Sequence, residues 1–136
     1  MNILVIAEHD HGQLKLATLA AAGCAQQLCG ASGGSFDHLA LGAGLDGVAA
    51  ALRNCGAANV LVADHPVLAE PLADKFAEVI ARVARERGST MIVGAASTFT
   101  KDVLPRAAAL LDAGMLSDVV DARPDGGGDF IFKRVM

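Results

Sequence analysis

The sequence predicts a three-layer α/β/α sandwich, in which helices cover both faces of a doubly wound, mostly parallel sheet and a C-terminal β-hairpin is added. Four short apolar runs alternate with Ala- and Leu-rich helical segments before Gly114; the runs are Ile3–Ala7, Phe36–Leu41, Val60–Ala63 and Met91–Val93. Such alternation is typical of parallel strands that helices bury on both sides. After Gly114 the pattern changes to two extended runs around a Pro-Asp-Gly-Gly-Gly turn, which favours a hairpin. We expect the strand order 3-2-1-4-5, numbered along the chain.

The first half of the chain supplies three strands and two helices. The predicted elements are a strand at Asn2–Ala7, a helix at Leu14–Leu28, a strand at Phe36–Leu41, a helix at Leu45–Asn54 and a strand at Asn59–Ala63. In the first helix the apolar positions that follow the helical period are Leu16, Leu19, Ala20, Cys24 and Leu28. The glycines at 30, 33 and 34 are expected to end that helix, because glycine readily adopts the left-handed conformation that follows a helix.

The second half begins with the clearest helix, predicted at Pro71–Arg87. Its apolar stripe consists of Leu72, Phe76, Val79, Ile80 and Val83, and its charged residues form a solvated opposite face. A strand follows at Thr90–Val93. Because proline cannot donate a backbone hydrogen bond, we expect one turn at Lys101–Leu104 and a regular helix at Pro105–Ala113. The hairpin strands are predicted at Asp118–Ala122 and Asp129–Val135.

Composition limits the class of function. A chain of 136 residues that is 53% hydrophobic and 19% charged predicts one globular domain with a real core. The net charge of −4 gives no reason to expect nucleic acid or anionic lipid as a partner. No apolar run reaches the roughly 20 residues that span a bilayer, and the N-terminus lacks a basic region typical of a signal peptide. We therefore expect a cytoplasmic protein without membrane insertion.

The three cysteines, Cys24, Cys29 and Cys55, are odd in number and show no Cys-x-x-Cys spacing. We interpret them as reduced, small apolar residues, as in most cytosolic proteins. They predict neither a metal site nor a redox pair.

The loop after the first strand reads Glu8-His9-Asp10-His11. A dinucleotide-binding fold carries a glycine-rich turn here, which lets a phosphate approach the backbone. Two acidic side chains should instead repel phosphate. His9, Asp10 and His11 are residue types that bind transition metals, but adjacent residues rarely converge on one ion, so we predict a polar loop that is solvated or contacts another subunit.

Two further histidines, His38 and His65, lie in or directly after predicted strands. His38 lies in the second strand, where we expect it to point away from the core. His65 follows Asp64 at the end of the third strand, and such a pair could act as a base. Because no candidate nucleophile accompanies the pair, we predict that Asp64 and His65 shape the loop.

The loop Gly94–Thr100 is the best candidate for a ligand site. Small residues after a strand permit close approach, backbone N–H groups before a helix can hold an anion, and Lys101 and Arg106 supply positive charge. The preferred interpretation is structural: the small residues allow tight strand–helix packing, and Ser97 or Thr100 caps the helix. Arg106 would then pair with a carboxylate within the fold or across an interface.

Three stretches resemble the electron-transfer flavoprotein alpha subunit. Leu4–Leu19 is similar to the opening strand and helix of that family, and Leu61–His65 to its third strand. Gly94–Asp118 resembles the family's Gly-Ala-x-Ser to Ser-Asp segment; the matching residues are Gly94, Ala95, Ser97, Lys101, Leu104, Pro105, Arg106, Ala108, Leu111, Ser117 and Asp118. Thr100 replaces a glycine that is frequent in the family.

This resemblance implies an N-terminal domain, residues 1–136, that pairs with a homologous beta subunit to form a heterodimer. The family's C-terminal domain holds most contacts to FAD and is absent from this sequence. The full heterodimer would carry electrons from dehydrogenases to a quinone oxidoreductase or another acceptor. We therefore expect no catalytic, cofactor-binding or metal-binding residue in this segment, and no FAD bound to it alone.

Two alternatives stay open. The chain could be a stand-alone nucleotide-binding protein of adenine-nucleotide hydrolase or stress-protein type, with phosphate at Gly94–Thr100. It could also be an interaction module whose sheet edge pairs with its own copy, because an edge strand leaves unpaired backbone groups. Since the chain stops at Met136, directly after a predicted strand, we expect another chain or further sequence to cover that edge.

Overall fold

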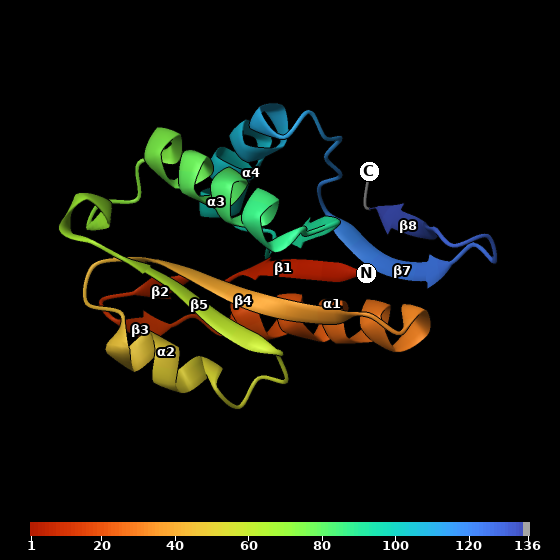
Figure 1. Cartoon of the computed structure of the whole chain (residues 1–136), viewed down its shortest axis with the longest axis horizontal. Helices are drawn as coiled ribbons and strands as arrows, with labels where there is room; N and C mark the ends of the chain where they lie inside the picture. The colour runs from red at the N-terminus through yellow and green to blue at the C-terminus, as the bar shows by residue number, and fades with distance from the viewer. Residues whose placement is uncertain (135–136) are drawn as a thin grey trace.

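The computed structural model describes residues 1–134. Its elements are β1 (Asn2–Ile6), β2 (His9–Asp10), β3 (Gln13–Leu14), α1 (Ala17–Ser32), β4 (Ser35–Gly42), α2 (Asp46–Leu52), β5 (Asn59–Asp64), the 3₁₀ helix η1 (Pro66–Leu68), α3 (Ala73–Arg87), β6 (Met91–Val93), α4 (Thr98–Leu110), β7 (Val119–Pro124) and β8 (Phe130–Arg134). Helices α3 and α4 lie on one side of the central strands, and α1 and α2 lie on the other (Figure 1). The predicted three-layer α/β arrangement is confirmed.

The central sheet has four parallel strands in the order β5-β4-β1-β6, which confirms the first four positions of the predicted order. Val5 of β1 pairs with His38 of β4 on one side and with Val93 of β6 on the other. The prediction was wrong about the fifth position, because β7 pairs antiparallel with β8 in a separate two-stranded sheet. This hairpin lies beside the N-terminus (Figure 1). The predicted hairpin is thus present, and the end of its second strand at Val135 lies outside the described residues.

Apolar side chains cover both faces of the sheet. On one face, Leu4, Ile6 and Leu39 pack with the α3 residues Phe76 and Ile80. On the other face, β1 and β4 pack against alanines of α1 and against Leu28. Because β1 and β4 have neighbours on both edges and both faces, they are almost entirely buried, as predicted for a parallel sheet.

Helix α1 departs from the prediction at both ends. Residues Gln13 and Leu14 form the short strand β3, so the helix begins at Ala17, and it ends at Gly33, whose φ of 77° is left-handed. The buried positions are Thr18, Ala21, Ala22, Ala25 and Leu28. The predicted core residues Leu16 and Leu19 are 81% and 46% exposed. Three alanines and Leu28, and not Leu16 or Leu19, face the sheet.

Helix α3 matches its predicted stripe through Phe76 and Ile80, while Val79 and Val83 are partly buried against the same cluster. It begins at Ala73, and Leu72, predicted to be in the core, is a half-exposed residue in extended conformation. A buried ion pair fixes its other end: the Asp37 carboxylate accepts hydrogen bonds from Arg87 at 3.1 and 3.3 Å and from Asn59 at 3.0 Å. This contact joins the end of α3 to β4 and β5.

Helix α4 runs through Pro105 without a break, from Thr98 to Leu110. The predicted boundary before Pro105 was therefore wrong, and so was the predicted end at Ala113. The buried residues Thr100, Val103 and Ala107 lie on both sides of the proline along the chain, so tertiary packing holds the helix together although one backbone hydrogen bond is lost.

Candidate functional site

The chain leaves the central sheet in opposite directions after two adjacent strands. After β1 it enters α1 on one face, and after β6 it enters α4 on the other (Figure 1). In open α/β sheets, ligands bind outside the carboxyl ends of the strands at such a switch point. The candidate site is therefore formed by the residues that directly follow β1 and β6: Glu8, and the loop from Gly94 to Ser97.

The backbone of Glu8 is fixed by the start of α1. Its N–H donates to Thr18 Oγ1 at 2.9 Å, and its carbonyl accepts from the N–H of Lys15 at 2.9 Å. Only 4% of Glu8 is exposed. The expectation that this residue belongs to a solvated loop was wrong. The two backbone hydrogen bonds hold Glu8 in an orientation in which its side chain is buried.

The side chain of Glu8 reaches the first turn of α4. Its Oε1 accepts a hydrogen bond from Thr100 Oγ1 at 2.9 Å and a second from the Ser97 hydroxyl. Ser97 Oγ also accepts from the Thr100 N–H at 3.1 Å, so Ser97 is the predicted cap of this helix. Glu8 Oε2 is buried and has no hydrogen-bond partner among residues 1–134. The site thus holds a carboxylate at the N-terminal end of α4.

The small residues of the fourth loop pack as predicted. A Cβ atom on Gly94 would lie 2.9 Å from Thr100 Cγ2 and 3.0 Å from Leu104 Cδ1. A Cβ at position 94 would crowd the ends of these two side chains, so glycine lets α4 lie close to the end of β6. The close approach serves helix packing, as predicted.

Both cations of the fourth loop are paired within the chain. Lys101 Nζ lies 3.1 Å from Asp118 Oδ1, and the Arg106 guanidinium contacts the Asp74 carboxylate. The prediction that Arg106 finds a carboxylate within the fold is confirmed. Both pairs are partly exposed, so each contributes little to stability, but each reduces the positive charge available to an anionic ligand.

A cavity of about 770 Å³ lies along the free edge of β6. It is enclosed by β6, by α1 and α4, and by the segment 113–119 that leads to the hairpin. Three residues on its lining, Met115, Leu116 and Val119, are large apolar side chains that are at least one-third exposed. This is the fifth position of the sheet, which the described residues leave open.

Comparison with known proteins identifies the family. The electron transfer flavoprotein domain matches residues 3–136 of the chain. The chain belongs to the electron transfer flavoprotein domain family. This confirms the resemblance noted at Leu4–Leu19, Leu61–His65 and Gly94–Asp118.

Relatives of this electron transfer flavoprotein domain are alpha subunits. It is 38% identical over 136 residues to the electron transfer flavoprotein subunit alpha of Pseudomonas aeruginosa, covering 98% of the chain and 40% of the relative. It is 35% identical over 127 residues to the mitochondrial subunit alpha of Oryza sativa, covering 88% of the chain and 34% of the relative. The chain is 27% identical over 133 residues to the Bacillus subtilis subunit alpha, covering 98% and 40%. The chain therefore spans little more than a third of the length of these relatives.

The rest of the first loop of this flavoprotein domain forms a small antiparallel ladder. Strands β2 and β3 pair His9 with Leu14 and Asp10 with Gln13, and His9 Nε2 lies 2.7 Å from the Leu41 carbonyl. Asp10 and His11 are exposed, as predicted for polar, solvated residues. In residues 1–134 no group of three or more His, Cys, Asp or Glu side chains could hold a metal ion.

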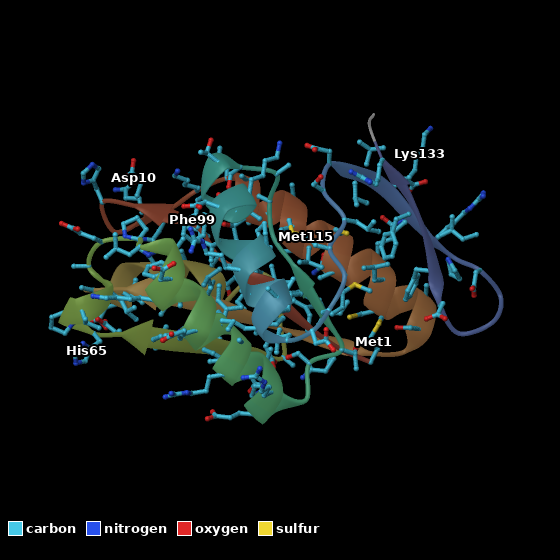
Figure 2. All side chains as sticks on the ribbon, turned by 90° about the horizontal axis from the view of Figure 1, so that it is seen from above. Met1, Asp10, His65, Phe99, Met115 and Lys133 are labelled. Carbon is cyan, nitrogen blue, oxygen red and sulfur yellow. The ribbon has the colours of Figure 1, made fainter. Side chains whose placement is uncertain are left out.

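Asp64 and His65 hold loop backbone through hydrogen bonds, in agreement with the predicted loop-shaping role. The Asp64 carboxylate accepts the backbone N–H groups of Gly44 and Leu45, both at 2.9 Å, and these hydrogen bonds lower the pKa of Asp64. His65 Nδ1 accepts the Val67 N–H at 3.1 Å at the start of η1. Figure 2 shows His65 and Asp10 at the same end of the molecule, opposite Lys133 of the hairpin.

His38 is fully buried in β4, so the prediction that it points away from the core was wrong. Its ring packs edge-on against Phe36, with centroids 5.5 Å apart. Neither ring nitrogen has a hydrogen-bond partner among the described residues, and burial lowers the pKa of His38. The imidazole of His38 is part of the core.

The three cysteines are free thiols, in agreement with their interpretation as small reduced residues. Burial raises the pKa values of Cys24 and Cys29, which favours the protonated thiol over the reactive thiolate. Among residues 1–134 no helix combines the length and apolar character needed to cross a bilayer.

Sequence reasoning missed the role of Glu8 and the cavity. Glu8 follows a strand within a run of polar residues, which is the pattern of a solvated loop, and nothing local indicates its contact with residues 89 and 92 positions away. The small residues of α1 and of the 94–96 loop are a signal for the cavity. The sequence analysis instead predicts a fifth strand at that position.

Proposed function

We propose that this chain is the N-terminal scaffold and subunit-pairing domain of an electron transfer flavoprotein alpha subunit, with residues 1–136 forming one domain. The domain is a component of an electron carrier and not an enzyme. The observation that carries this proposal is the cavity beside β6, because its apolar lining continues onto exposed Met115 and Leu116. Exposed apolar surface next to an unpaired sheet edge is typical of a protein–protein contact.

The cofactor of the assembled protein is proposed to be FAD, held outside this segment. The residues present do not fit its diphosphate. The carboxylate of Glu8 lies at the start of α4 and would repel it. Lys101 and Arg106 are paired with carboxylates, and the Thr100 side chain packs against Gly94. Phe99, the aromatic residue of the loop, already packs against Phe76 with ring centroids 5.8 Å apart. The segment therefore carries no catalytic, cofactor-binding or metal-binding residue in this proposal.

The proposed partner is the electron transfer flavoprotein beta subunit, in a heterodimer that carries electrons from dehydrogenases to a quinone oxidoreductase or another acceptor. We propose a cytoplasmic location. The relatives include subunits of two bacteria and a mitochondrial subunit of a plant. The bacterial cytoplasm and the mitochondrial interior both suit a carrier of this kind.

Pairing is tested by co-expression of the full gene product with the beta subunit of the same operon or genome, followed by affinity purification. We expect Leu116→Glu to reduce recovery of the beta subunit, because it places a charge on the apolar rim. Val67→Glu is the matched control, since Val67 is equally exposed, at 51% against 50% for Leu116, but follows β5 at the other edge. Equal recovery with both variants would contradict pairing at this cavity.

The cofactor proposal has its own test. The purified 136-residue chain is titrated with FAD and flavin fluorescence is followed. We expect no saturable quenching, and one-to-one binding at micromolar concentration would overturn the proposal. Translating the DNA downstream of the Met136 codon shows whether the flavin-binding part is encoded next to this domain.

The alternative of a nucleotide-binding protein is not favoured by the site. A phosphate at Gly94–Thr100 would meet the Glu8 carboxylate, and Lys101 would have to leave Asp118. ATP-dependent thermal stabilisation that is lost in Lys101→Ala would support it instead.

A further inference from the structure

The switch point of this domain contains the elements that hold anions in related architectures. Helix α4 is 13 residues long, and the first N–H groups of a helix lack intrahelical partners and favour negative charge. Phosphate groups bind at such helix starts in many α/β proteins. The hydroxyls of Ser97 and Thr100 lie in the same turn and are suitable additional donors.

In this chain those donors already serve an anion. Glu8 Oε1 accepts from Thr100 Oγ1 at 2.9 Å and from the Ser97 hydroxyl. The backbone of Glu8 is held in place, because its N–H and carbonyl are bound by Thr18 and Lys15. A side chain from the end of β1 thus takes the contacts that a bound phosphate would make with the side chains of α4.

The burial of this carboxylate has no other visible compensation. Glu8 is 96% buried, since only 4% is exposed, and Oε2 has no partner among residues 1–134. None of the ion pairs among the described residues includes Glu8. A buried carboxylate without a cation is costly, so the helix start and its two hydroxyls provide the stabilisation that a counter-ion would otherwise give.

We infer that Glu8 is an internal anion that fills the anion position at the switch point and thereby excludes phosphate-bearing ligands from this domain. Exclusion has two physical parts. The carboxylate occupies the hydroxyl donors, and its charge repels a second anion at short range in a poorly solvated position. The inference does not depend on the proposed pairing with a beta subunit. That proposal rests on the apolar lining of the cavity, whereas this inference rests on the carboxylate of Glu8.

The test compares the wild-type chain with Glu8→Ala and Glu8→Ser, which remove the carboxylate and leave space. Glu70→Ala is the matched control, because it removes the same charge from an exposed position. Each protein is titrated with inorganic phosphate and with ATP at constant ionic strength, set with chloride. The amide resonances of residues 97–101 are followed by ¹⁵N NMR, together with the melting temperature.

We expect saturable, phosphate-dependent shifts at residues 97–101 in the Glu8 variants, accompanied by a rise in melting temperature. The wild type and Glu70→Ala should show neither effect. Adding Ser97→Ala to a responding Glu8 variant should weaken phosphate binding at least severalfold, because one of the two hydroxyl donors is gone. Saturable shifts in the wild type would overturn the inference, as would folded Glu8 variants that do not respond.

Loss of Glu8 could unfold the chain, and the test still decides. If neither variant is folded in chloride, phosphate at equal ionic strength should raise the folded fraction measured by circular dichroism, because a ligand that binds the folded state stabilises it. Phosphate that is no better than chloride would overturn the inference.

Discussion

Removal of Arg87 should destabilise the domain far more than removal of another arginine from the same helix. Arg87 pairs with Asp37, whose side chain is 2% exposed, while that of Arg87 is 40% exposed. Arg87→Ala leaves the buried carboxylate with only the Asn59 amide at 3.0 Å. Breaking a buried pair in this way costs about 3–5 kcal/mol, and we expect about 3 kcal/mol because one hydrogen bond to the carboxylate remains.

The opposite change is expected to cost less. Asp37→Ala leaves a guanidinium that is already partly exposed and can turn to water, so we expect about 2 kcal/mol, mainly from lost hydrogen bonds. The double variant should be more stable than the sum of the two losses predicts, because no unpaired carboxylate is left in it. Arg82→Ala is the control, since Arg82 is exposed on α3.

The assay is urea unfolding followed by far-ultraviolet circular dichroism, because the chain has no Trp or Tyr. With a slope of about 2 kcal/mol per molar urea, Arg87→Ala should lower the midpoint by about 1.5 M and Asp37→Ala by about 1 M. Arg82→Ala should leave the midpoint within about 0.25 M. Equal midpoints for Arg87→Ala and Arg82→Ala would refute the reasoning that the buried carboxylate needs its partner.

Three further predictions concern stability. Burial lowers the pKa of His38 in the folded state, so the unfolded state binds its proton first and stability should fall as the pH drops below about 6.5; His38→Leu should show a smaller loss of urea midpoint between pH 7.5 and 5.5, and an equal loss would argue against a role of this histidine. Ala25, fully buried on α1, should not tolerate enlargement: Ala25→Leu should cost about 1–3 kcal/mol, whereas Leu19→Ala on the exposed side should shift the midpoint by no more than Arg82→Ala does. Pro105→Ala should raise the melting temperature, because it permits a backbone hydrogen bond inside α4 that proline cannot donate; a lower melting temperature would show that the ring itself is needed for packing.

The sequence was sufficient for the class of fold because the four strands are short apolar runs that alternate with helical segments, and this signal is local. It was insufficient for the fifth position of the sheet, since a strand that pairs with β6 and a strand that pairs with β8 have the same pattern. In α1 the helical period predicted a core face with Leu16, Leu19 and Leu28, but only Leu28 is buried there, and alanines form the rest of the contact with the sheet.

The candidate site was predicted only in part, because some of its contacts are local in sequence and others join distant segments. Ser97 and His65 cap backbone N–H groups three and two residues away, and contacts of this range can be predicted from spacing along the chain, whereas Asp64 contacts Gly44 and Leu45 on a distant segment. The contact of Glu8 with Thr100 joins the ends of two strands that are adjacent only after the sheet has formed. The prediction for His38 was wrong because alternation along a strand gives a solvent-facing side only in a sheet with one open face, whereas the helices on both faces of this sheet bury both sides of β4.

The alanine face of α1 has a consequence for how this domain can vary. With Ala21, Ala22 and Ala25 against the sheet, methyl groups set the separation between helix and strands, and a larger side chain at these three positions must push the layers apart. Leu16 and Leu19 point elsewhere and are free of that restriction. Sequences that keep this fold should therefore differ in how freely positions along α1 vary. The positions that face the sheet should keep small residues, and the exposed positions should accept many residue types.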